Sequence, residues 1–303
     1  MNGILIIDKP QDYTSFDVVA VVRGCMRERR AGHTGTLDPM ATGVLPILLG
    51  NATKAQSLLP DTDKEYECGF RLGIATDTLD ITGRVLSETA SSADRSDSEA
   101  LLPQFRGDIM QVPPMYSAVS KNGVRLYELA RKGIETEREA RPVHIGLLEL
   151  TGFDKEKQTG TLKIACSKGT YIRSVCDDLG KLLGCGCVMT SLRRTRACGC
   201  DISRATALDE IRRLADCDRA ALEALVRPTD EIFSEYQRIT LSHEQAFRFR
   251  NGGGLTLSRI RGADGLQDGM CRIYGADCGF IGLGIADRKN DTLGFKKLFL
   301  QDK

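Results

Sequence analysis

The twenty residues from Ala31 to Gly50, AGHTGTLDPMATGVLPILLG, constrain this chain more than any other segment. They contain four glycines, two prolines and a single acid, Asp38, and they end in the strand-like apolar run Val44 to Leu49. A loop this rich in glycine can bring its backbone close to a ligand. The segment therefore predicts an ordered loop that displays one carboxylate in front of a buried strand.

The residues alone leave two interpretations of Asp38 open. A lone acid displayed from a glycine-rich loop is a candidate nucleophile or base. Asp38 followed by Pro39 is also typical of a turn or of a helix start, because Asp accepts backbone N–H bonds as N-cap and Pro fits the first helical position. His33, taken by itself, is more typical of a hydrogen-bonding loop residue than of a catalyst.

Further blocks of sequence lie on both sides of this loop, and together with it they cover most of the chain from Gly3 to Arg196 in order. The blocks are GILIIDKPQDYTSFDVV at 3–19, GHTGTLDPMATGVLPILLG at 32–50, DKEYECGFRLGIATDTLDITG at 63–83, FRGDIMQVPPMYSAVSKNGVRLYELARKGIE at 105–135, CSKGTYIRSVCDDLGKLLG at 166–184 and SLRRTR at 191–196. Together they closely resemble the TruB family of bacterial tRNA pseudouridine synthases, which modify uridine 55 in the T loop. The resemblance is looser after Arg196.

The resemblance implies an α+β fold with two domains. The first, residues 1–236, would be a pseudouridine synthase catalytic domain with a mixed, mainly antiparallel sheet flanked by helices. The second, residues 237–303, would be a small β-rich PUA-like RNA-binding domain. The composition agrees, since short apolar runs and glycines dominate after Pro228. The segment from His243 to Leu255 resembles the opening helix and loop of such a domain.

The resemblance also implies the reaction and its site. Uracil would be detached from its ribose at N1, rotated and reattached through C5 after base flipping, with Asp38 as nucleophile or base and without metal or other cofactor. Arg173 would pair with Asp38, and Tyr66 would stack on the target base and assist proton removal at C5. The remaining matched positions would contact substrate: Tyr171 beneath the ribose or the Asp–Arg pair, Leu192 on the uracil, and His33 in the space that flipped bases vacate.

One position departs from the family pattern. Some relatives carry a further acid within a DTxDxxG pattern, where this chain has Thr82 in DTLDITG. Any network that this acid supports in those relatives is in question here.

Eleven cysteines invite a metal interpretation. Cys185 and Cys187, and likewise Cys198 and Cys200, form two Cys-Gly-Cys pairs. Structural zinc sites usually separate paired cysteines by two to four residues. We therefore expect reduced, partly buried thiols and no zinc.

The charge balance is nearly neutral, with a formal net charge of +1, so it does not by itself indicate nucleic-acid binding. Arginines nevertheless cluster locally, and local basic patches can hold phosphates. One cluster, formed by Arg23, Arg27, Arg29 and Arg30, lies just before the glycine-rich loop, and the other begins within the last block. The second comprises Arg193, Arg194, Arg196, Arg204, Arg212 and Arg213.

Alternatives to the tRNA enzyme come from different classes. A guide-RNA-dependent pseudouridine synthase would share the aspartate chemistry but usually carries lysine-rich extensions, which this chain lacks. A non-catalytic RNA-binding or tRNA-folding protein could use the same surface. A zinc deaminase is disfavoured, because no His-x-Glu accompanies a Pro-Cys-x-x-Cys. We expect tRNA as partner through its T arm and T loop, no guide RNA, no membrane, a monomer, and a cytoplasmic location, since no signal peptide is visible.

Hydrophobic periodicity predicts the principal elements. Strands are expected at 3–7, 64–72, 143–153 and 161–167, the last two joined by a turn at 159–160. Helices are expected from Thr14 or Ser15, with Phe16, Val18, Val19, Val22 and Met26 on the apolar face, and at 124–132, 171–183 and 206–225. A polar loop at 90–98 would lead into a short helix, and apolar runs at 271–274, 280–285 and 295–300 predict strands in the second domain.

Overall fold

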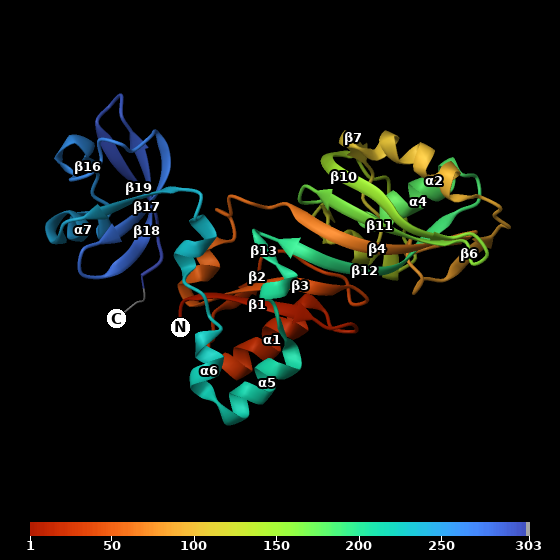
Figure 1. The fold of residues 1–303 in the computed structure, drawn as a ribbon, viewed down its shortest axis with the longest axis horizontal. Helices are drawn as coiled ribbons and strands as arrows, with labels where there is room; N and C mark the ends of the chain where they lie inside the picture. The colour runs from red at the N-terminus through yellow and green to blue at the C-terminus, as the bar shows by residue number, and fades with distance from the viewer. Residues whose placement is uncertain (301–303) are drawn as a thin grey trace.

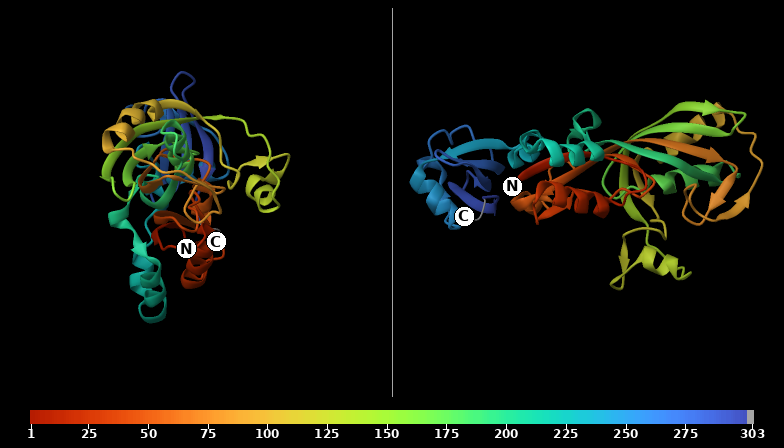
Figure 2. Two further views of the ribbon diagram at one scale, coloured as in Figure 1. Left: turned by 90° about the vertical axis from the view of Figure 1, so that its right-hand side faces the viewer. Right: turned by 90° about the horizontal axis from the view of Figure 1, so that it is seen from below.

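The computed structural model describes residues 1–300 as an elongated molecule with two large sheets and two small two-stranded ones (Figures 1 and 2). Ten strands within these residues form the larger, mixed sheet. Its strands in spatial order are β14 (Thr206–Ala207), β1 (Gly3–Lys9), β3 (Thr42–Leu49), β12 (Cys187–Ala197), β4 (Lys64–Leu72), β11 (Thr159–Cys166), β10 (Arg141–Asp154) and β7 (Gly107–Gln111), with β2 (Ala31–His33) beside β3 and β13 (Cys200–Asp201) beside β12. The α+β architecture expected from the resemblance is confirmed.

Most neighbours in this sheet are antiparallel, and two junctions are parallel. β12 meets β3 in parallel through Arg193 and Arg194, and β1 meets β14 in parallel. Because β12 pairs with β3 on one side and β4 on the other, it joins the N-terminal half of the sheet to the half built from β4, β11, β10 and β7.

Helices cover the two halves of the sheet separately. α1 (Ser15–Met26) and α5 (Leu208–Cys217) bury their apolar faces against Leu5, Ile7 and Ile47 of β1 and β3. α4 (Ile172–Leu182) packs through Ile172, Val175 and Leu179 against β4 and β12. The remaining helices before residue 236 are α2 (Arg95–Leu101), α3 (Leu126–Arg131) and α6 (Arg219–Ala224), with 3₁₀ turns η1 (Gly50–Ala55), η2 (Leu102–Phe105), η3 (Ile202–Arg204) and η4 (Thr229–Phe233).

Two small hairpins leave the main sheet. β5 (Ile74–Thr76) pairs with β6 (Val85–Glu88), and the loop between them contains Asp80. β8 (Ser120–Lys121) pairs with β9 (Val124–Arg125), and together with α3 it projects away from the body, as the second view in Figure 2 shows.

The C-terminal module is a separate five-stranded sheet within the described residues, with its own core around Phe249, Ile273 and Ile281. It contacts the catalytic part through a cluster that includes Ala55, Phe233 and Phe299. Its elements are β15 (Gln237–Leu241), α7 (His243–Arg250), β16 (Leu255–Thr256), η5 (Leu257–Arg259), β17 (Gly269–Gly275), β18 (Gly279–Asp287) and β19 (Thr292–Leu298).

Several expected boundaries were wrong for local reasons. The helix expected over 206–225 is interrupted at Asp218, whose carboxylate accepts the N–H of Ala221 (2.9 Å) and starts α6. The turn of the long hairpin comes before Thr159, because the Asp154 carboxylate accepts the backbone N–H of Lys157 (3.1 Å) and bends the chain there. At 124–132 a strand pair precedes α3, and α2 begins at Arg95, inside the expected polar loop. Strands β1, β4 and β17–β19 confirm the expected ones.

Phe16 does not belong to the buried face on which its spacing placed it. The side chains of Val18, Val22 and Met26 are almost fully buried, whereas Phe16 is 73% exposed. It occupies the first turn of α1 and belongs to none of the core clusters among the described residues.

Gly43 provides a test of how β3 and β12 are joined. Its φ is +103°, and an added Cβ would lie 2.2 Å from the carbonyl oxygen of Arg194. Gly43→Ala should therefore lower the free energy of unfolding by about 2–4 kcal/mol through left-handed strain and backbone displacement.

The matched control is Gly24→Ala in α1, where an added Cβ meets nothing within 4 Å. Helix propensity predicts a gain of up to about 1 kcal/mol there. Thermal unfolding of both variants checks the pair, and equal melting temperatures would contradict the close approach at Gly43.

Candidate active site

The buried side chain of Arg194 binds the backbone of the glycine-rich loop. Its side chain is fully buried, in register with Tyr66 across β12 and β4. The guanidinium donates to the carbonyl oxygens of Val44 (2.7 Å), Gly35 (3.1 Å) and Thr36 (3.4 Å). Since a planar guanidinium offers five donors in fixed directions, one side chain fixes both the loop and the start of β3.

Two further residues hold the same loop from the N-terminal side. The Ser15 hydroxyl accepts the N–H of Leu37 (2.8 Å) and donates to its carbonyl oxygen (3.2 Å). The fully buried Lys9 ammonium donates to the carbonyl oxygens of Tyr13 (2.6 Å), Pro10 (2.9 Å) and Pro39 (3.2 Å). Burial lowers the pKa of Lys9 to about 8, although the nearby Asp38 charge opposes this shift.

Asp38 points from this loop to the guanidinium of Arg173, with Oδ2 3.1 Å from Nη2. Residues 38–41 form a turn, in which the Ala41 N–H donates to the Asp38 carbonyl (3.0 Å), and no helix begins there. The helix-cap interpretation of Asp38 and Pro39 is therefore wrong. The carboxylate is free to take part in an ion pair because the loop returns directly into β3.

Arg173 lies in the first turn of α4, and its guanidinium is buried at the centre of several interactions. It donates to the carbonyl oxygens of Tyr116 (2.8 Å) and Thr78 (2.9 Å), and its Nη1 lies 3.7 Å from Oδ2 of Asp80. Two carboxylates thus flank one guanidinium. The expected pairing of Asp38 with Arg173 is observed, and Asp80 is an additional partner.

Desolvation by the surrounding protein raises the pKa of Asp38 above its ordinary value. Arg173 acts in the opposite direction, Asp80 raises the pKa further, and Lys9 lowers it. The side chain keeps 38% of its surface exposed, so a ligand can reach it. The result is an accessible carboxyl that is more basic than a solvated aspartate and is held in place by a cation.

Thr82, which stands where some relatives carry an acid, contacts Asp80. Its hydroxyl donates to Oδ1 of Asp80 (2.6 Å), and its backbone N–H lies 3.1 Å from the same oxygen. The Thr78 hydroxyl is a third donor to that oxygen (2.8 Å). Asp80 is therefore fixed opposite Arg173 without a second carboxylate.

Two tyrosines and a leucine complete the surroundings of Asp38. Tyr66 is buried on β4, and burial raises the pKa of its phenol to about 12, with a smaller contribution from the Asp38 charge. Tyr171 directly precedes α4, and burial raises the pKa of its phenol, although the nearby Ser117 and Arg173 lower it. Leu192 is buried in the same core cluster as Tyr66, in register with Cys68. Both phenols are thus neutral near pH 7.

His33 ends β2, and among the described residues it is neither hydrogen-bonded nor ion-paired to Asp38 or Arg173. Desolvation and the charge of Arg194 lower the pKa of its imidazole. Its ring meets the ring of Phe16 edge-on, with centroids 5.3 Å apart at 77°. His33 is therefore a neutral ring beside the site and not part of the Asp38–Arg173–Asp80 arrangement.

Five of the six arginines in the second cluster are buried or already paired with acids. Arg194 is buried under the loop, and Arg193 pairs with Asp8 (2.8 Å). Arg196 pairs with Asp61 and Glu65, both at 3.3 Å. Arg212 and Arg213 pair with acids one helical turn earlier. The acids separated from these arginines in sequence are brought beside them by strand pairing.

The eleven cysteines are all free within the described chain. Over residues 1–300, no group of three or more His, Cys, Asp or Glu residues is arranged to hold a metal ion. Cys68 and Cys176 meet in the core with their Sγ atoms 3.6 Å apart. The Cys-Gly-Cys pairs do not gather into a ligand set.

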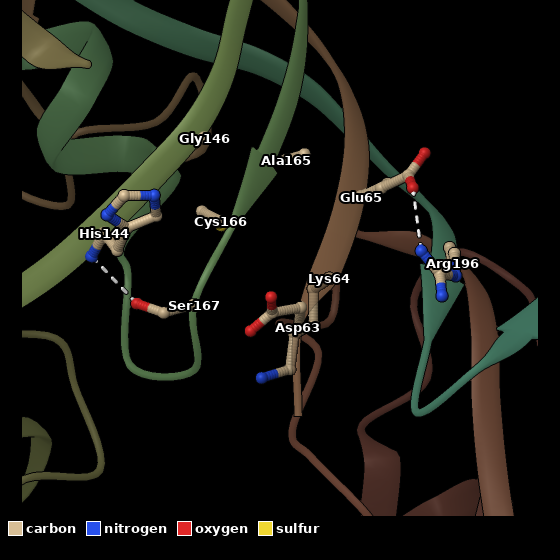
Figure 3. Close-up of a pocket in the computed structure, with 9 residues that line it drawn as sticks. All are labelled: Asp63, Lys64, Glu65, His144, Gly146, Ala165, Cys166, Ser167 and Arg196. Carbon is tan, nitrogen blue, oxygen red and sulfur yellow. Dashed lines mark hydrogen bonds and ion pairs between the residues drawn. The ribbon is translucent and has the colours of Figure 1, made fainter. Parts of the chain in front are cut away.

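A pocket of about 200 Å³ lies at the sheet end next to Tyr66 (Figure 3). Lys64, on the same strand two residues before Tyr66, forms one wall, and Ser167 and His144 form the opposite wall. Burial lowers the pKa of Lys64. The other lining residues are Asp63, Glu65, Gly146, Ala165, Cys166 and Arg196.

Comparison with known proteins agrees with this geometry. Residues 23–172 match the model of the TruB family pseudouridylate synthase N-terminal domain, and residues 173–234 match the tRNA pseudouridylate synthase B C-terminal domain. The chain belongs to the TruB family of pseudouridylate synthases. It is accordingly an enzyme of the isomerase class.

Curated relatives cover nearly the whole chain. The tRNA pseudouridine synthase B of Stutzerimonas stutzeri (strain A1501) is 43% identical over 94% of this chain and 91% of the relative. The proteins of the same name from Pseudomonas putida (strain GB-1) and Pseudomonas aeruginosa (strain UCBPP-PA14) are each 42% identical over the same shares.

Solved structures extend the fold comparison to the C-terminal module. A Cbf5-Nop10-Gar1 complex contains a chain with a TM-score of 0.72 and 23% identity, covering 98% of this chain and 85% of that one. An H/ACA RNP bound to a substrate RNA containing 2′-deoxyuridine contains a chain with a TM-score of 0.72 and 21% sequence identity. The match covers 99% of this chain and 85% of that one. At these identities the comparison concerns the fold alone.

Every helix within residues 1–300 is too short or too polar to span a membrane.

Sequence reasoning assigned no role to Lys9 and Asp80 and the wrong role to Arg194. The sequence did indicate that Lys9 and Arg194 are buried. Lys9 lies two residues after Ile7 and Arg194 two residues after Leu192, each on the same face of its strand as that apolar residue. A charge placed on the inward face of a strand must find buried partners. Asp80 gave no such signal, because its contact with Arg173 spans distant parts of the chain.

Arg173→Lys tests whether the geometry of the guanidinium matters beyond its charge. One ammonium cannot contact Asp38, Asp80 and two carbonyl oxygens at once. We expect turnover to fall at least about tenfold, which corresponds to about 1.4 kcal/mol. Single-turnover kinetics with bound RNA measures it. Arg84→Lys, at an 80% exposed side chain in the nearby loop, is the matched control and should be neutral. Equal turnover in both variants would mean that only the charge is required.

Proposed function

We propose that this chain isomerises uridine 55 in the T loop of tRNA to pseudouridine. The observation that carries the proposal is the accessible Asp38 carboxyl, desolvated and paired with Arg173 at 3.1 Å, in a member of the pseudouridylate synthase family. The relatives that align over 94% of this chain are named tRNA pseudouridine synthase B. That name supports a tRNA substrate.

Asp38 is proposed as the catalytic nucleophile or base. The reaction breaks the bond between N1 of uracil and C1′ of ribose and forms one between C5 and C1′. C5 loses its proton and N1 gains one, so atoms and electrons balance without a redox cofactor. A carboxylate can serve it if it is ionised, accessible and rigid. Arg173 would keep Asp38 ionised against desolvation, while Asp80, held by Thr82, would keep Arg173 in position.

Each remaining site residue is proposed to contact the flipped nucleotide. Tyr66 would stack on the target base and assist proton removal at C5, and Leu192 would line the uracil pocket. Tyr171 would lie beneath the ribose or the Asp38–Arg173 pair. His33 would fill the space that the flipped bases leave, in keeping with its neutral ring. Flipping costs a few kcal/mol, which stacking in the pocket would offset.

The partner is proposed to be tRNA alone, engaged through its T arm by a monomer in the cytoplasm, without guide RNA. Residues 237–303 would act as a PUA-like RNA-binding domain, of which 301–303 lie outside the described residues. The separate core of this module supports treating it as a domain. The assay that tests the proposal is pseudouridine formation in a tRNA transcript with no guide RNA and with chelator present.

Asp38→Asn should abolish pseudouridine formation while the affinity for tRNA stays within about tenfold, or about 1.4 kcal/mol. The amide keeps the size of the side chain but can neither attack nor accept the proton. Filter binding and a pseudouridine assay measure the two quantities. Asp209→Asn, at a 91% exposed side chain on α5, is the control. Turnover near that of the unaltered chain would sink the nucleophile or base assignment.

The pH profile gives a second prediction. Since desolvation raises the pKa of Asp38, protonation begins at a higher pH than for a solvated aspartate, which titrates near about 4. The protonated form is inactive, so kcat/KM should fall with acid along a limb centred above that value. Initial rates across the acidic range measure the limb. A midpoint at or below the pKa of a solvated aspartate would show that the Arg173 charge lowers the pKa of Asp38 more than desolvation raises it.

A further inference from the structure

Phe16 is more exposed than any other large apolar side chain among residues 1–300, at 73%. It is the one member of the apolar pattern of α1 that packs on no core cluster. Single exposed apolar side chains are common and need no explanation by themselves. Phe16 differs because of what surrounds it.

The three residues at the start of α1 point in different directions from one rigid turn. Thr14 caps the helix, accepting the N–H of Asp17 (3.1 Å), and the Asp17 carboxylate accepts the N–H of Thr14 (2.8 Å). Ser15 points inward and holds both backbone groups of Leu37, the residue before Asp38. Phe16 points outward. Its backbone is therefore fixed relative to the loop that carries Asp38.

The ring of Phe16 lies against the neutral ring of His33, with centroids 5.3 Å apart. At an interplanar angle of 77° the two rings are not stacked on each other, so the exposed Phe16 ring keeps a face available. The two rings come from α1 and β2, and together they form an uncharged aromatic step beside the loop. Nδ1 of His33 is buried without a hydrogen-bond partner in the described chain, which agrees with an uncharged ring used for packing.

We propose that Phe16 is a base-stacking residue: its ring receives an unpaired base of the substrate RNA next to the target uridine. This inference rests on the proposed function, because an RNA loop bound at Asp38 supplies such a base. Aromatic side chains are the usual platforms for unstacked RNA bases. A lone rigid ring beside the site fits one base, whereas a protein partner requires a contiguous apolar patch.

The first test separates stacking from general hydrophobic contact. Phe16→Ala and Phe16→Leu should raise KM for a T-arm hairpin between about 5-fold and about 150-fold, with little change in kcat, since stacking contributes on this scale per base. Phe16→Trp should retain the KM of the unaltered chain. Leu182→Ala, at a 51% exposed side chain at the other end of α4 from Arg173, is the control and should be neutral. An unchanged KM in Phe16→Ala, or equal KM in the Leu variant and the unaltered chain, would overturn the inference.

The second test uses the absence of tryptophan from this sequence. Phe16→Trp creates a single fluorophore, whose emission should be quenched in a saturable manner when the hairpin binds, because a stacked base quenches indole. Leu182→Trp should report no quenching at the same RNA concentrations. Binding without quenching in Phe16→Trp would overturn the inference.

The third test identifies the base. Hairpins with one abasic nucleotide at each loop position other than the target are compared between the unaltered chain and Phe16→Ala. One of these abasic hairpins should bind the unaltered chain more weakly than the intact hairpin does. For that hairpin, the unaltered chain and Phe16→Ala should have the same affinity. A full difference on every abasic hairpin would overturn the inference. No pseudouridine with the unaltered chain would overturn the proposed function, whereas normal turnover with an unaffected Phe16→Ala overturns only the stacking role.

Discussion

The buried guanidinium of Arg194 is the interaction on which the rest of the site depends. It lies in the parallel junction between β12 and β3 and satisfies carbonyl groups of the loop at Gly35 and Thr36. A charge in that position is tolerated only because its donors are used. The loop is thereby held at the point where the two halves of the sheet meet, and Asp38 is brought to face the helix that packs on the second half.

The chemistry of Asp38 follows from this placement. One wall of the site belongs to the N-terminal half of the sheet, which contributes the loop, Lys9 and Ser15. The other wall belongs to α4 and the loop between β5 and β6, which contribute Arg173 and Asp80. Because the carboxyl is desolvated while facing a cation, it combines raised basicity with a fixed orientation. The same packing leaves the start of α1 uncovered, and that is where Phe16 and His33 meet.

Prediction from sequence succeeded where the determining interactions are local or where a long pattern resembles a family. The strands β1, β4 and β17–β19, the start of α1 and the pairing of Asp38 with Arg173 belong to this group. It failed where a side chain competes with the backbone, as at Asp154 and Asp218, since short carboxylates redirect a turn or restart a helix at little cost. It also did not show which strand arginines are paired, because the partners of Arg193 and Arg196 lie far from them in the sequence.

The sequence by itself determined the α+β class, the loop with its single acid, the family and the residues opposite that acid. Those features depend on local composition and on a pattern too long to arise by chance. Only the tertiary structure decided which charges are buried, which arginines are neutralised, and which apolar residue stays in solvent. These depend on sheet register and on which element covers which face. The periodicity that groups Phe16 with Val18, Val22 and Met26 describes one helix, whereas burial depends on where its neighbours end.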